Sequence, residues 1–177
     1  MATKEQVEEA RGLIRGAMSA TLATQRDGQP FASLITPAPA PDLSPLLLIS
    51  TLAEHTRHLK AEPRCALLFS GSTGEPNPQT APRVSVTGLA APVPEEEVTA
   101  LKARWLARHP YGALYAGFAD FSLWRVTIGG ALLVGGFGRA QRLRASDLAP
   151  DAQAAGPGAG PAAAPLSPGE RRRPRGP

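Results

Sequence analysis

Short segments with strand character recur along the chain, and they constrain its fold more than any other feature of the sequence. Each is four to eight residues long, and its apolar side chains either alternate with polar ones or follow one another directly. We expect seven strands, at residues 20–24, 29–36, 46–49, 65–70, 83–90, 121–128 and 131–134. The turn signals Arg26-Asp27-Gly28 and Gly129-Gly130 predict hairpins. Short links of this kind favour a mostly antiparallel sheet that closes into a small barrel.

Three helices are predicted to flank this barrel, and each opens with a start signal. They cover Thr3–Met18, Thr51–Ala61 and a segment that begins at Pro94. Thr3 with Gln6, and Thr51 with Glu54, have the spacing of capping boxes. The third helix has a proline at its first position and three glutamates in its first turn. We therefore expect a mainly β domain with flanking helices over residues 1–150, in which residues 71–82 form a polar, mobile loop.

The positive charge of the chain is concentrated at its carboxyl end. The formal net charge is +4, but residues 154–177 hold four arginines against one glutamate, which leaves +1 for residues 1–153. A nucleic-acid-binding face therefore has no support outside this tail. Residues 151–177 contain six prolines, five glycines and almost no core-forming side chains, and we expect a disordered tail rich in Ala, Gly, Pro and Arg.

The cysteine and histidine content excludes several kinds of site. Cys65 is the single cysteine, so the chain forms no internal disulfide and no thiolate zinc cluster, and we expect its thiol to be buried and inert. His55 and His58 have no third His or Cys nearby, and we expect no metal site. Met1–Ala10 lacks an apolar signal core, and no apolar run reaches the length of a membrane span. These features predict a cytoplasmic protein without a membrane segment.

The junction between the third expected strand and the second expected helix is the most informative segment for function. Free backbone amides and the positive end of the helix dipole gather near Ser50 and Thr51, so that an anion can bind there. Arg57 can add a bidentate clamp, and His55 and Thr56 lie in the same first turns. A phosphate monoester fits such a site. Alternatively, Ser50 or Thr51 only caps the helix and the charged side chains are solvated.

Two strand residues allow both a ligand contact and an ordinary structural role. Arg83 opens a strand on the same face as Ser85 and Thr87, and this polar row either meets a planar ligand with carbonyl oxygens or faces solvent. Ser33 shares a face of the second strand with Phe31, where its hydroxyl either contacts a ligand or is satisfied within the core. The residue types alone leave both alternatives open.

Four parts of the chain carry a resemblance to a known superfamily. They are GQPFASLITP at 28–37, PLLLISTLAEHTRHLKAEPRCALLF at 45–69, PRVSVTGLA at 82–90, and LWRV at 123–126 with LLVGGFGRA at 132–140. Over residues 5–145 the chain resembles the pyridoxamine 5'-phosphate oxidase-like FMN-binding split-barrel superfamily, close to its haem-utilisation branch. The resemblance implies an antiparallel split β-barrel that forms a homodimer and holds two FMN molecules in clefts between the subunits.

The resemblance also implies a set of cofactor-binding residues. They are Ser33 on the second strand, then Ser50, His55, Thr56 and Arg57 near the phosphate, and Arg83 beside the isoalloxazine ring. A cation at the last position would stabilise negative charge on the reduced ring. The second strand, FASLIT, lacks the Arg and Lys of true pyridoxamine-phosphate oxidases, and their carboxy-terminal Arg and His motif is not visible. The resemblance therefore does not extend to oxidation of pyridoxamine phosphate.

The expected function is that of a flavin-dependent oxidoreductase, in which the protein positions FMN and the sequence leaves the small-molecule substrate open. A haem-binding or haem-utilisation protein is the first alternative, with His55, His58 and His109 as the available histidine ligands. The second alternative is a non-catalytic barrel whose basic tail contacts a nucleic acid or an acidic partner.

Overall fold

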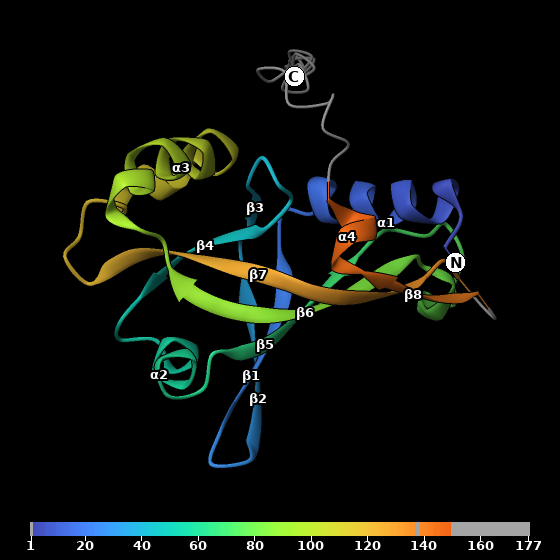
Figure 1. Cartoon of the computed structure of the whole chain (residues 1–177), viewed down its shortest axis with the longest axis horizontal. Coiled ribbons are helices and arrows are strands. Elements are labelled where there is room, and N and C mark those ends of the chain that lie inside the picture. Colours follow the sequence, from blue (N-terminus) through green and yellow to red (C-terminus); the bar gives the residue numbers. More distant parts are fainter. Residues whose placement is uncertain (1, 137–138, 150–177) are drawn as a thin grey trace, which may run out of the picture.

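Eight antiparallel strands form one curled sheet in the computed structural model, which describes residues 2–136 and 139–149 (Figure 1). The strand order is β2-β1-β5-β6-β7-β4-β3, and β8 pairs with β7. The strands are β1 Ala20–Arg26, β2 Gln29–Ile35, β3 Ala38–Pro39, β4 Pro45–Ser50, β5 Arg64–Ser70, β6 Arg83–Pro92, β7 Phe121–Val134 and β8 Ala140–Arg144. The predicted antiparallel split barrel is confirmed. The expected tail, residues 151–177, lies outside the described residues.

The two predicted hairpins have different outcomes. Asp27 and Gly28 both adopt a positive φ, of 51° and 80°, as the turn between β1 and β2 requires. Gly129 and Gly130 are not among the described glycines with positive φ, and β7 continues through them as one strand of 14 residues. The prediction of a hairpin here was wrong, because a glycine pair turns the chain only where the backbone enters the left-handed region. The strand that pairs back onto β7 is β8, which was not predicted from sequence.

Four α-helices accompany the sheet in the described ranges: α1 Lys4–Gly16, α2 Glu54–Ala61, α3 Glu95–Arg108 and α4 Ala145–Leu148. Figure 1 shows α1, α3 and α4 on one side of the long β6–β7 ribbon and α2 on the other. The predicted capping box of Thr3 and Gln6 is present. The 3-10 helices η1 Pro78–Thr80, within the predicted loop, and η2 Pro110–Leu114 complete the elements. None of the helices in these ranges is long and apolar enough to cross a membrane.

The second predicted capping box is wrong. The residue before α2 is Ala53, and no side chain caps this helix. Thr51 lies too early in the chain to cap it, and its amide donates to the backbone oxygen of Asp120 at 2.8 Å. The turn after β4 is therefore tied to the chain segment that precedes β7.

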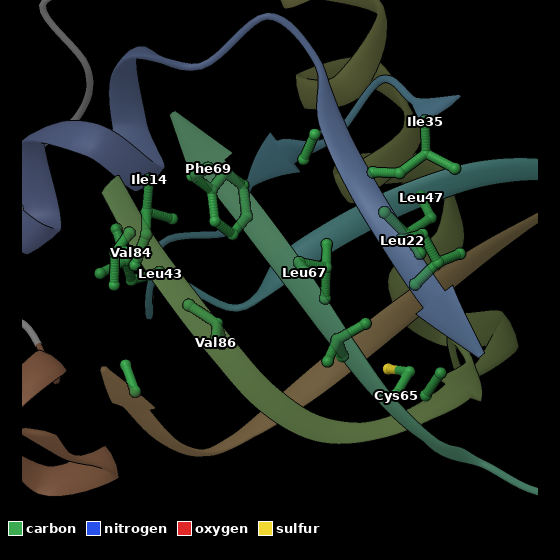
Figure 2. Packing of buried hydrophobic residues seen from close by; sticks show 14 of the residues in the cluster. Ile14, Leu22, Ile35, Leu43, Leu47, Cys65, Leu67, Phe69, Val84 and Val86 are labelled. Carbon is green, nitrogen blue, oxygen red and sulfur yellow. The ribbon is translucent and has the colours of Figure 1, made fainter. Parts of the chain in front are cut away.

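The inner face of the sheet forms the larger core cluster. Figure 2 shows Leu22, Leu67 and Val86, from the adjacent strands β1, β5 and β6, pointing into this cluster. Ile14 of α1 closes it at one end. Cys65 is buried at its edge, as predicted, and burial raises the pKa of the thiol to about 11. This thiol is therefore protonated at neutral pH, which removes it as a nucleophile.

A second cluster, centred on Trp105, anchors α3 to the link after β2. The indole Nε1 of Trp105 donates to Thr36 O at 2.9 Å, and His109 Nε2 lies 2.9 Å from Pro37 O. A carbonyl oxygen only accepts, so Nε2 carries the proton of His109, and Nδ1 accepts from the Tyr111 hydroxyl at 3.1 Å. His109 is fully buried and therefore neutral in the folded chain.

We expect the protein to lose stability as the pH falls below about 6.5, the ordinary pKa of histidine. Burial lowers the pKa of His109 in the folded chain, and its hydrogen bond to Pro37 offsets this only in part. The unfolded chain then binds the proton at a higher pH than the folded one, so that acid favours unfolding. Burial lowers the pKa of His55 in the same direction. Thermal unfolding of the wild type and of His109→Gln at pH 7.5 and 5.0 tests this. The loss of Tm should be smaller in the variant, and an equal loss contradicts the assignment.

Candidate functional site

The turn between β4 and α2 is fixed by the hydroxyl of Ser50. Ser50 Oγ donates to Asp120 Oδ2 at 2.6 Å and accepts from the amide of Leu52 at 3.0 Å. Both interactions hold the turn, so this hydroxyl is engaged within the protein. Asp120 stands 70 residues away in sequence and immediately precedes β7. No local motif marks Asp120, so it is absent from the residues predicted from sequence.

The first turn of α2 contains two buried polar atoms without a partner. Thr56 is completely buried, and its Oγ1 has no hydrogen-bond partner among the described residues. His55 Nδ1 lies 3.2 Å from Ser33 Oγ, whereas His55 Nε2 is shielded from solvent and has no partner in the described part of the chain. Buried polar groups in folded proteins are almost always hydrogen-bonded. Two such atoms occur in consecutive residues at the start of this uncapped helix, and of the two residues His55 lines the neighbouring cleft.

An apolar cleft of about 230 Å³ lies beside this helix start. Its walls come from the end of β2, from β4, from the approach to α2 and from the first residue of β7. The lining residues are Leu34, Ile35, Thr36, Leu47, Leu48, Ile49, Ser50, Ala53, His55 and Phe121. Most of these side chains are aliphatic, so the cleft suits a flat, apolar group. Ser50 and His55 form the polar edge of the cleft. The hydrogen bond from Trp105 to the backbone oxygen of Thr36 fixes the position of one of these lining residues.

Glu54, Arg57 and His58 form a chain of contacts along α2, and Glu54 and His58 line a second pocket beside Phe31 rather than the apolar cleft. Arg57 Nη1 lies 3.1 Å from Glu54 Oε2, and His58 Nε2 lies 3.2 Å from Glu54 Oε1. His58 is buried, and its Nδ1 lies 3.0 Å from Thr24 Oγ1. Phe31 contacts its ring edge-on, with centroids 5.2 Å apart. Both nitrogens of His58 are thus occupied, while the Arg57 guanidinium is half exposed and held only by Glu54 among the described residues.

Arg83 is the one predicted site residue that the fold places elsewhere. It pairs with Val134 at the far end of β7, whereas Ser50 pairs with Phe121 at the near end. The 14 residues of β7 span roughly 40 Å along the strand. Arg83 Nη1 donates to the backbone oxygens of Gln79 and Ala81 at 3.0 and 3.1 Å. The fold gathers the other predicted residues around the start of α2: Ser33, Ser50, His55, Thr56 and Arg57.

Comparison with known proteins agrees with this architecture. The family model described as pyridoxamine 5'-phosphate oxidase matches residues 6–135. The chain therefore belongs to this family of split barrels, and its resemblance to the haem-utilisation branch is confirmed. The chloroplastic haem oxygenase HOZ of Arabidopsis thaliana is 36% identical over 123 residues, which are 68% of this chain and 37% of that protein. The chain thus spans well under half the length of this curated relative.

Two solved structures show how far the likeness extends. The haem-binding protein of Mycobacterium smegmatis is 29% identical with a TM-score of 0.78, covering 84% of this chain and 61% of that one. ChuZ of Campylobacter jejuni is 17% identical with a TM-score of 0.73, covering 84% of this chain and 63% of that one. At that identity ChuZ shows the shared fold alone. Relatives of this chain therefore include proteins named for haem.

Proposed function

We propose that the protein is a homodimeric flavoprotein that binds FMN at the start of α2 and uses it in an oxidoreduction of a small molecule. The observation that carries this proposal is the pair of buried, unpartnered atoms of the described chain, His55 Nε2 and Thr56 Oγ1, at the uncapped start of α2. A phosphate there meets the positive end of the helix dipole and the half-exposed guanidinium of Arg57.

The cleft supplies what the rest of the cofactor needs. Its aliphatic walls would bury one part of a flavin ring and exclude water, and Phe121 would add an aromatic contact. Ser50 acts indirectly, because its hydroxyl is already engaged by Asp120 and Leu52 and so orients the turn. Bound FMN would supply the transfer of electrons to or from the substrate.

The position of Arg83 supports a dimeric site. Because Arg83 lies at the far end of β7, it reaches a ligand at α2 only from a second subunit. The outer face of the sheet offers a surface for that subunit. Its two central rows are small or apolar and mostly exposed: Leu34, Thr21, Leu68 and Ser85, then Ala32, Ala23, Ala66 and Thr87. We infer that this face joins two protomers and that Arg83 of the partner subunit approaches the flavin ring.

Haem binding is a second candidate, and one observation favours it specifically. His58 and His109 have both ring nitrogens bonded, but His55 keeps Nε2 without a partner in the described residues. Ser33 on the opposite nitrogen would fix the ring orientation, as is usual for a metal-ligating histidine. The names of HOZ and of the mycobacterial protein support this candidate. Haem bound through His55 would compete with FMN for the same site. The tail-based alternative rests on residues outside the described ranges.

We expect the protein to bind FMN at one molecule per chain and Arg57→Ala to weaken that binding about 10- to 150-fold. This range corresponds to roughly 1.5–3 kcal/mol for a charge-assisted hydrogen bond. Riboflavin, which lacks the phosphate, should bind both proteins nearly equally. Flavin fluorescence titration measures both ligands. Arg64→Ala is the matched control, because Arg64 follows the other end of α2 and pairs with Glu62. Equal losses of FMN and riboflavin would move Arg57 away from the phosphate.

The same preparation separates the two candidates. If FMN is the ligand, added haem should bind more weakly or be displaced by saturating FMN. If haem is the ligand, a sharp Soret band should form in the presence of FMN and disappear in His55→Ala. That second result would replace the flavin proposal with the haem one.

A further inference from the structure

Glu54 places a negative charge where the proposed function requires an anion to bind. It is the first residue of α2, and its two carboxylate oxygens contact Arg57 and His58 at 3.1 and 3.2 Å. The carboxylate therefore holds one nitrogen, Nη1, of the guanidinium that would bind a phosphate. It also interacts favourably with the same end of the helix dipole.

The two basic side chains that Glu54 contacts differ in how firmly the surrounding structure holds them. His58 is buried between Thr24 and Phe31, so it holds one carboxylate oxygen of Glu54 in place. Arg57 is half exposed, and an exposed ion pair of this kind is weak. An incoming anion can therefore draw Arg57 away, while Glu54 stays on His58.

We propose that Glu54 determines the specificity of this site by acting as a built-in competitor of the anion. The inference rests on the proposed function, because it concerns the same site. A free phosphate ion gains only the contacts at the helix start and must overcome the nearby carboxylate. A phosphate joined to a flat apolar group also gains the burial of that group in the cleft beside α2. The site thereby accepts a ring-bearing phosphate monoester and rejects inorganic phosphate.

Replacement of Glu54 by Gln tests this inference, because the expected result is a gain of FMN affinity rather than a loss. Glu54→Gln keeps the length of the side chain and an oxygen for His58, but it removes the charge. We expect FMN affinity to rise about 5- to 20-fold, riboflavin affinity to stay unchanged, and millimolar inorganic phosphate to compete with FMN in the variant but not in the wild type. A purely structural role for Glu54 would lower affinity instead.

Glu62→Gln is the matched control. Glu62 follows the last residue of the same helix, pairs with Arg64, and undergoes the same change of charge. FMN affinity should stay at the wild-type value in this variant, and circular dichroism should show that both variants are folded. If Glu54→Gln does not fold, Glu54→Ala provides the second test, since it also removes the charge, and FMN affinity should rise. If wild-type protein binds FMN and the folded Glu54 variant binds it equally or less tightly, the inference is overturned. If wild-type protein does not bind FMN at all, the proposed function fails instead.

Discussion

Gly88→Ala should lower the melting temperature of the protein by roughly 6–12 °C or more, corresponding to a loss of at least about 3 kcal/mol. A Cβ atom at Gly88 would overlap the backbone oxygen of Thr127 and lie 2.9 Å from Cγ1 of Val126. Gly88 sits at the register shift between β6 and β7, opposite Ile128. The obstructing oxygen belongs to a paired strand in the middle of the sheet, so it cannot move without breaking the ladder.

Gly129→Ala is the matched control for this prediction. Gly129 lies in the same pair of strands, but the nearest atom to its added methyl group is the backbone oxygen of Thr87, at 3.6 Å, which is an ordinary contact. This substitution should change the stability by less than about 1 kcal/mol, since alanine also restricts the unfolded chain. Thermal unfolding of both variants gives the comparison. Similar melting temperatures would show that the ladder relaxes around Gly88.

Leu68→Glu should convert the proposed dimer into monomers and weaken FMN binding at least about tenfold. Leu68 is 37% exposed on the outer sheet face, between Thr21 and Ser85, so the charge costs little in a single protomer. In the dimer the same charge would be buried without a partner, which costs several kcal/mol. FMN affinity should fall with the dimer, because the monomer lacks the second subunit's contribution from Arg83.

Sedimentation velocity and flavin titration at one protein concentration measure both effects. Leu114→Glu is the control, because Leu114 is 81% exposed in η2 and lies outside the outer sheet face. This variant should keep the wild-type mass and affinity. A monomeric Leu68→Glu protein with full FMN affinity would show that one chain forms the whole site. A variant that remains dimeric would place the interface on another surface.

The fold could be predicted from sequence wherever a local rule decides the structure. Asp27-Gly28 forms the expected turn, because the chain reverses there and both residues adopt the positive φ that this reversal needs. Gly129-Gly130 carries an equally strong signal, yet β7 continues through both residues, and Gly130 pairs with Thr87 of β6 and with Arg144 of β8. Long-range pairing decided the second case, and no short window of sequence reports on it.

The candidate site was predictable for the same reason only in part. The residues from Ser50 to Arg57 are contiguous, so one strand-to-helix junction brings them together. Ser33 joins them through the hairpin that sequence could also identify. Asp120 and Phe121 reach the site through the pairing of β4 with β7, across a separation of about 70 residues. The distance of Arg83 from the site could not be predicted from sequence either, because it follows from the long-range register of β6 on β7.

The length of β7 has a consequence for the proposed dimer. One end of this strand, at Phe121, borders the cleft of its own protomer, and the other end, at Val134, pairs with the Arg83 that would serve the partner's cleft. Each β6–β7 pair would then contribute to both bound cofactors, with Phe121 at its own cleft and Arg83 at the partner's. The length of β7 would set the distance between the cleft of one protomer and the Arg83 that this protomer lends to its partner, and insertion of two residues near the middle of β7 would change that distance while leaving the ten residues that line the cleft unchanged.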